Sequence, residues 1–222
     1  MRISRRSTLS LRAVALLYLA LLLLLPLGVV FARTFEHGLG EAWSWVTTPA
    51  AISAFWLTVL IAVIAVPLNT IFGVGAAMVL ARTKARGRSV LDALIDLPFV
   101  VREVAPVLRE VGDEQEQAAA TLGASSWQTF WRVTLPTIRW GVAYGVVLTT
   151  ARALGEIGAV LVVSSNVAGS TLTLPLLLFQ RDEQIGSQVT TSVYALATEL
   201  AVLSIAVLLL MTMFGSRTKD AR

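Results

Sequence analysis

Two ionisable side chains, Arg152 and Glu156, stand four residues apart within a stretch that is otherwise mostly apolar. On a helix this spacing places both groups on one face, where they can neutralise each other. An ionisable group inside a membrane helix is energetically costly and marks a functional site by default. The pair therefore indicates either the charged lining of a pathway or a structural ion pair that lowers the cost of insertion.

A second distinctive segment lies at 102–139, where the apolar composition gives way to polar residues. Asp113, Glu114 and Glu116 precede a run of alanines, and Gly123 follows that run. Carboxylates suit the positive end of a helix dipole, and glycine suits the left-handed conformation that commonly ends a helix. This order of residues predicts a short helix that ends at Gly123.

Another short helix is predicted directly after the first. Ser125 or Ser126 can serve as its N-cap, and the helix would end before Pro136. Its larger apolar residues would form one stripe, made of Trp127, Phe130 and Trp131. Such a helix-turn-helix can dock as an amphipathic plug in a groove of a partner protein. The alternative is that the same stripe packs on the chain's own apolar helices.

The residue types argue against an enzyme. The chain contains no cysteine and one histidine, so thiolate metal sites, histidine-based metal sites and a catalytic triad are excluded. It has no P-loop sequence, so any ATP hydrolysis must belong to another subunit. We interpret Gly73 and Gly75 as points of close helix packing and not as a phosphate cradle. We therefore expect no cofactor and no metal.

The composition is that of a membrane protein. Of the 222 residues 56% are hydrophobic and 14% are charged, whereas roughly 25% are charged in an ordinary soluble domain. An apolar helix of about 20 residues crosses a hydrocarbon core of about 30 Å. We therefore predict an all-α, polytopic membrane protein with a single domain, 1–222, and four spans, at about 13–32, 54–81, 140–163 and 190–214. The first span is interpreted as a retained anchor, because the apolar part of a cleaved signal is only about 7 to 15 residues long.

The distribution of basic residues predicts the orientation. With the N-terminus inside, four spans leave 15 of the 18 Lys and Arg residues inside and only Arg33 and Arg181 outside, while Arg152 lies within a span. Lys and Arg concentrate on the cytoplasmic side of membrane proteins. Both termini and the loop at 102–139 are therefore predicted to be cytoplasmic, and the basic pI is a result of topology and not a sign of nucleic-acid binding. The apolar segment 91–101 is too short to cross alone and is expected to lie in the interface, to re-enter, or to be a remnant of a longer span.

The string QAAATLGASSWQTFWRVTLP, at 117–136, resembles the loop signature of binding-protein-dependent ABC transporter permeases. That signature is Glu-Ala-Ala, three residues, Gly, nine residues, Ile or Val, one residue, Leu-Pro. Gln117 stands where the family usually has Glu, and Glu116 beside it would point about 100° away on a helix. The resemblance implies the fold of type I ABC importer permeases, with a cytoplasmic coupling helix-turn-helix. It implies that an ATPase docks on Glu116, Gln117, Ala118, Ala119, Gly123, Ala124, Leu135 and Pro136.

Three further strings, at 66–82, 131–165 and 171–178, resemble the W-type membrane subunit of sulfate/thiosulfate importers. The resemblance implies a multi-pass subunit in the bacterial plasma membrane that transports sulfate or thiosulfate. It implies ABC ATPase subunits, a second permease subunit and an extracytoplasmic sulfate-binding protein as partners, besides the lipid bilayer. Molybdate permeases share the pattern Ala-Arg-x-Leu-Gly-Glu found at 151–156, so a permease for another oxyanion such as molybdate is an alternative.

The middle of the chain departs from the family pattern. Such permeases usually have six spans and two Leu-Pro-Phe stretches, whereas this sequence has one such stretch, at 97–99. The residues at 95–99 resemble the first stretch of the family, and those at 101–108 resemble the second. We interpret this as the loss of the third and fourth spans. A non-transporting membrane interaction protein that retains only the ATPase-docking loop is therefore a further alternative.

Overall fold

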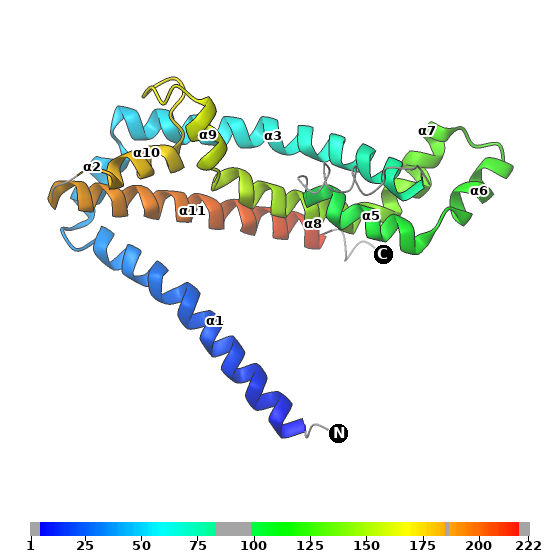
Figure 1. The fold of residues 1–222 in the computed structure, drawn as a ribbon, viewed down its shortest axis with the longest axis horizontal. Coiled ribbons are helices and arrows are strands. Elements are labelled where there is room, and N and C mark those ends of the chain that lie inside the picture. The colour runs from blue at the N-terminus through cyan, green and yellow to red at the C-terminus, as the bar shows by residue number, and fades with distance from the viewer. Residues whose placement is uncertain (1–4, 83–98, 185–186, 218–222) are drawn as a thin grey trace. The chain divides into compact units, whose positions relative to one another are not determined.

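The computed structural model describes residues 5–82, 99–184 and 187–217, and within these ranges the chain forms helices and no strand (Figure 1). The all-α prediction is thereby confirmed. The chain divides into two compact units. Unit 1 comprises Met1–Phe55 and Leu161–Leu203, and unit 2 comprises Trp56–Val160 and Ser204–Arg222. Most of the apolar segment predicted at 91–101 lies outside the described residues.

The longest described helices are α1 (Arg5–Thr34), α3 (Pro49–Arg82) and α11 (Ser187–Arg217). Among the described residues, three stretches are long and apolar enough to cross a membrane: Val14–Thr34, Pro49–Arg82 and Thr191–Met213. The spans predicted at 13–32, 54–81 and 190–214 fall on these helices. The apolar side chains of α1 are largely exposed, as expected for a helix that faces lipid.

The span predicted at 140–163 is divided in the structure. Helix α8 (Leu135–Leu154) ends where the amide of Gly155 donates to the carbonyl of Arg152 at 3.1 Å, and α9 (Gly158–Val163) follows after a short break. Within the break, Glu156 Oε1 accepts a hydrogen bond from the amide of Ala159 at 3.1 Å. This carboxylate satisfies one of the amides that lack a partner at the start of a helix. A glycine and a side-chain acceptor thus interrupt an apolar stretch whose composition predicts one span.

Unit 1 contains two further helices, α2 (Leu39–Val46) and α10 (Leu174–Asp182). The end of α1 is joined to α11 by Thr34, whose hydroxyl donates to the carbonyl of Tyr194 at 2.8 Å and lies 2.7 Å from the hydroxyl of Thr198. The guanidinium of Arg181 on α10 lies over the ring of Trp45 on α2, 6.0 Å from its centroid. Polar side chains thereby connect the helices of this unit.

Unit 2 is built around α5 (Phe99–Val111), which packs closely against α3 and α8. A Cβ added to Gly145 on α8 would lie 2.7 Å from the Cα of Val100, and one added to Gly141 would lie 2.9 Å from the carbonyl oxygen of Glu103. A Cβ on Gly73 of α3 would lie 2.7 Å from the Cβ of Val100. Small residues let helix backbones approach in this way. The buried apolar core consists of Val74, Ala77, Leu80, Val100, Val101, Val104, Ala105, Leu108 and Ile138.

The predicted packing role is confirmed for Gly73 and has no counterpart for Gly75 among the described residues. No atom lies within 4 Å of a Cβ built on Gly75, so its helix face meets no neighbour in the described chain. The two glycines are only two residues apart on α3 and therefore point in different directions. Both positions were predicted from the residue type alone, and the position of α5 decides which of the two glycines is packed.

These contacts predict opposite effects for two alanine substitutions. Gly145→Ala places a methyl group against the backbone of α5, and we expect it to lower the free energy of unfolding by about 1 to 3 kcal/mol. The matched substitution Gly75→Ala enters open space in a helix, and we expect it to raise that free energy by about 0.5 to 1 kcal/mol. Denaturant titration in detergent, followed by tryptophan fluorescence, measures both. Equal stabilities of the two variants would contradict the close packing at Gly145.

Candidate docking loop and charged pair

The first predicted short helix is present as α6 (Glu114–Thr121), and the chain leaves it through Gly123. Gly123 has φ +85°, the left-handed conformation predicted for this glycine. The amide of Gly123 donates to the carbonyl of Ala120 at 3.0 Å, and the amide of Ala124 donates to that of Ala119 at 3.0 Å. These bonds satisfy carbonyl groups at the end of the helix. A Cβ at Gly123 would meet no described atom within 4 Å, so the turn is open to a partner.

The second predicted short helix begins at α7 (Ser126–Thr129), with Ser125 as its N-cap. The Ser125 hydroxyl accepts a hydrogen bond from the amide of Gln128 at 3.3 Å, and the Gln128 side chain accepts one from the amide of Ser125 at 2.9 Å. This reciprocal capping box fixes the start of the helix.

The predicted end of this helix before Pro136 is wrong. The chain continues from α7 through a π-helical turn, η1 (Phe130–Thr134), directly into α8. Proline lacks an amide hydrogen and normally breaks the α-helical bonding pattern. A wider π turn upstream changes that pattern locally, so the helix continues past the proline.

The aromatic stripe of this segment is divided: Trp127 and Trp131 are exposed, whereas Phe130 is half-buried and packs against the core of unit 2. Trp127, Phe130 and Trp131 form one cluster, with ring centroids 5.4 to 6.2 Å apart. Trp127 is 69% exposed, Trp131 is 50% exposed, and Leu122 in the preceding turn is 89% exposed. The alternative in which the stripe packs on the chain's own helices therefore describes Phe130 but not Trp127 or Trp131. An exposed apolar surface of this kind is typical of a protein interaction site.

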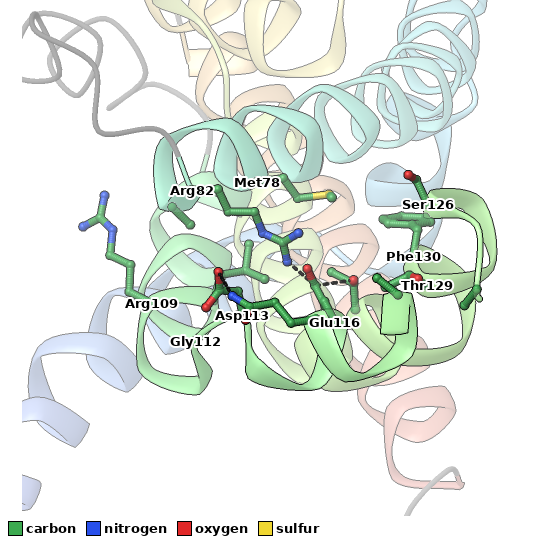
Figure 2. A pocket seen from close by; sticks show the side chains of 15 residues that line it. Met78, Arg82, Arg109, Gly112, Asp113, Glu116, Ser126, Thr129 and Phe130 are labelled. Atoms are coloured by element: carbon green, nitrogen blue, oxygen red, sulfur yellow. Dashed lines mark hydrogen bonds and ion pairs between the residues drawn. The ribbon is translucent and has the colours of Figure 1, made fainter. Parts of the chain in front are cut away.

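Glu116 and Gln117 face different surroundings, as the 100° step between neighbouring helix residues predicts. Glu116 Oε1 forms an ion pair with Arg82 Nη2 at the end of α3 and accepts a hydrogen bond from Thr134 Oγ1 at 2.5 Å (Figure 2). The exposed side chain of Gln117 instead donates to Asp113 Oδ2 at 2.8 Å. The carboxylate of Glu116 is thus directed inward, and Gln117 presents an amide at the surface.

A cavity of about 800 Å³ lies beside this ion pair, between the ends of α3 and α5 and the segment that carries α6 and α7 (Figure 2). Met78, Arg82, Arg109, Asp113, Glu116 and Phe130 are among its lining residues. Ala124 also lines the cavity. Of the other predicted docking residues, Ala118 and Pro136 are exposed, while Ala119 and Leu135 are half-buried. The predicted loop at 102–139 therefore surrounds a hollow instead of lying flat on the helices.

Sequence reasoning missed Arg82 and Thr134 as partners of Glu116. Arg82 lies 34 residues before Glu116, and Thr134 lies 18 residues after it. No local spacing connects such positions. The one available signal is that Arg82 ends a predicted span, where a basic side chain often meets polar groups at the membrane surface.

Arg152 and Glu156 lie close together, as their spacing predicts. Arg152 Nε is 3.7 Å from Glu156 Oε2, which is an ion-pair distance and longer than a hydrogen bond. The guanidinium also lies over the ring of Phe99 on α5, 5.8 Å from its centroid. The Arg152 side chain is 59% exposed, whereas that of Glu156 is 31% exposed. The arginine head group is therefore held from two sides and still has an open face.

The chain belongs to the family of binding-protein-dependent transport system inner membrane components, whose model matches residues 2–220. It is a multi-pass membrane transport subunit and not an enzyme. The sulfate transport system permease protein CysW of Synechocystis sp. is 40% identical over 93% of this chain and 92% of its own length. The proteins of the same name from Synechococcus elongatus and Escherichia coli are 38% and 35% identical, over 95% and 86% of this chain and 90% and 83% of their own lengths.

The alignments also contain positions that have no counterpart in this chain. The Synechocystis alignment has 256 positions, and 93% of 222 residues is about 206, so about 50 aligned positions are gaps in this chain. The Synechococcus alignment, with 260 positions and 95% of the chain, leaves about 49 such positions. Two spans of roughly 20 residues each, with a connection, require about this length. The total thus has the length that the predicted loss of two spans would require.

Proposed function

We propose that the protein is the permease subunit of an ATP-driven sulfate importer. The observation that carries the proposal is the segment 117–136, which matches the permease loop signature and presents an exposed apolar surface around a left-handed glycine. The similarity to sulfate permeases over most of the chain supports sulfate as the substrate, with thiosulfate as a related one. A molybdate permease and a non-transporting interaction protein are the alternatives.

The family description implies a separate binding protein and an ATPase as partners. We propose, more specifically, two ABC ATPase subunits, a second permease subunit and an extracytoplasmic sulfate-binding protein. The docking residues would be those of the predicted loop apart from Glu116, whose carboxylate is directed inward, with Leu122 and Trp127 added because of their exposure. In this arrangement the exposed apolar side chains enter a groove of the ATPase, and burial of their surface stabilises the complex.

We also propose that the protein lies in the bacterial plasma membrane with both termini and the segment 117–136 in the cytoplasm. The support is the distribution of the Lys and Arg residues that lie in loops and termini: 15 fall on the cytoplasmic side in this orientation and two on the opposite side. This orientation places the docking surface on the side where ATP is available. The whole chain, 1–222, would then form one membrane domain.

Cysteine labelling tests this orientation directly, because the native chain contains no cysteine. We expect Ser126→Cys to react with a membrane-impermeant maleimide only after the membrane is opened. Gly169→Cys lies in the connection between the predicted spans 140–163 and 190–214, which is outside in this orientation, and it should react in intact cells. Labelling of Ser126→Cys from outside would reverse the proposed topology.

Docking is tested by two substitutions with a similar backbone cost. Gly123→Asp and Gly169→Asp each force a side chain into a left-handed conformation, with φ +85° and +84°, and each has open space around it. The strain is on the order of 1 kcal/mol in both variants. We expect Gly123→Asp to lose most of the co-purified ATPase subunit, since it adds bulk and charge to the docking surface. Gly169→Asp should retain it.

The measurement is a pull-down from detergent-solubilised membranes, normalised to inserted protein. Equal retention of the ATPase by both variants would contradict the docking role of Gly123. Failure of the wild-type chain to retain any ATPase would contradict the proposed permease function itself.

We propose that Arg152 lines the sulfate pathway. Its guanidinium has an open face, and a planar guanidinium can donate two hydrogen bonds to an oxyanion. The alternative is that Arg152 and Glu156 serve only to neutralise each other. The two alternatives differ in what happens when both charges are removed together.

Uptake of labelled sulfate by the complex in proteoliposomes separates these alternatives. We expect ATP-dependent uptake that excess molybdate does not suppress, and a loss of roughly tenfold or more in Arg152→Ala. The double variant Arg152→Ala/Glu156→Ala should remain as impaired as the single one. Recovery of uptake in the double variant would favour the structural ion pair. Absence of uptake by the wild-type complex, with the ATPase bound, would favour the non-transporting alternative.

A further inference from the structure

Helix α6 is weakly attached to the rest of unit 2. None of its side chains is buried, so it lacks the apolar face that normally holds a helix in place. It has only eight residues, and an isolated helix of this length is unstable in water. The cavity beside it further separates it from the ends of α3 and α5. It packs on α7 and η1, so its position relative to α3 must depend on a small number of polar contacts.

Glu116 supplies those contacts. A single carboxylate oxygen, Oε1, bonds both to Arg82, the last residue of α3, and to Thr134, the last residue of η1. The Glu116 side chain is only 14% exposed, and Thr134 is 3% exposed. A charge-assisted bond in such a setting is stronger and less screened than an ion pair in open water. One side chain of α6 thus connects to the end of one long helix and to the start of α8.

Other polar groups of α6 do not provide an equivalent connection. Gln117 bonds to Asp113, which immediately precedes α6. The hydroxyl of Thr121 donates to the carbonyl of Ala118 within α6. These bonds stabilise the helix itself and leave its position relative to α3 unchanged. Figure 2 shows Glu116 and Arg82 directed toward each other beside the cavity.

We propose that Glu116 is a positioning residue that transfers movement of a bound ATPase from α6 to α3 and α8. This inference rests on the proposed docking function and adds the path by which the docking surface moves the membrane helices. An ATPase that displaces α6 would pull on Arg82 and Thr134 through the same carboxylate oxygen. Because α6 packs on α7 and η1 and the cavity separates it from α3, loss of the carboxylate would let α6 move while α3 stays in place.

The test uses the complex of the full chain with the ATPase and second membrane subunit of the same organism. A single cysteine, Val79→Cys, reports on α3, since Val79 lies three residues before the end of that helix, is 58% exposed, and no native cysteine interferes. Its rate of labelling is compared with and without ATP and vanadate, and is normalised to the ATPase retained. We expect a nucleotide-dependent rate in the otherwise wild-type complex and loss of this difference with Glu116→Gln. Glu114→Gln removes the same charge from the same helix and should keep the difference.

Two further variants separate positioning from general instability. Arg82→Gln removes the partner and should cause the same loss, and the double variant Arg82→Gln/Glu116→Gln should lose no more than either single one. Thr134→Val keeps the ion pair and should cause a smaller loss. If Glu116→Gln fails to insert, Arg82→Gln carries the test.

The outcomes distinguish this inference from the proposed function. A wild-type chain that retains no ATPase contradicts the proposed function. A wild-type complex that retains the ATPase contradicts the inference if the labelling of Val79→Cys is independent of nucleotide, or if Glu116→Gln and Arg82→Gln both keep the nucleotide-dependent difference. Equal losses in Glu114→Gln and Glu116→Gln would also contradict it, because a general charge effect would then explain both.

Discussion

The close approach of α5 to α8 at Gly141 and Gly145 is the contact on which unit 2 depends. In both positions a single methyl group would collide with the backbone of α5. Gly73 gives α3 the same access to Val100. Because lipid is as apolar as a leucine side chain, burial alone drives little association between membrane helices, and close van der Waals contact becomes important. The three glycines make such contact available along α5.

The packing at α5 also determines where the segment that carries α6 and α7 begins. Once α3, α5 and α8 are fixed, the ends of α3 and α5 and the start of η1 form three sides of a hollow. The chain between α5 and η1 must bridge this hollow, which keeps α6 away from the apolar core. Polar contacts then replace apolar burial as the means of holding the helix. Because polar contacts hold its ends, the segment that carries α6 and α7 can expose apolar side chains and still have a defined start and end.

The roughly 50 aligned positions without a counterpart in this chain bear on function more than on the local fold. The segment 117–136, the charged pair and the glycine contacts all lie in parts of the chain that the structure describes. A loss of two spans preserves the direction of the remaining ones, since each span reverses the chain. The surface that an ATPase would meet is therefore retained whether or not the pathway is complete.

The sequence by itself determined the features that depend on near neighbours along the chain. Apolar runs predicted three of the long helices, and the order of Asp, Glu, Ser and Gly residues predicted both short helices and the left-handed glycine at 123. The loop signature and the strings beside it predicted the family. These signals are local because helix propensity, capping and span length each act within about 20 residues.

Tertiary structure decided the features that require two distant segments to meet. The role of Gly73 and the lack of such a role for Gly75 depend on where α5 passes, which no spacing within α3 encodes. The break at Gly155 and the continuation of the helix past Pro136 are local, yet each competes with an opposite local preference that composition favours. The bond of Glu116 to Arg82 and Thr134 joins residues 34 and 18 positions apart. Only the folded chain brings these groups together, because the helices between them set the distance.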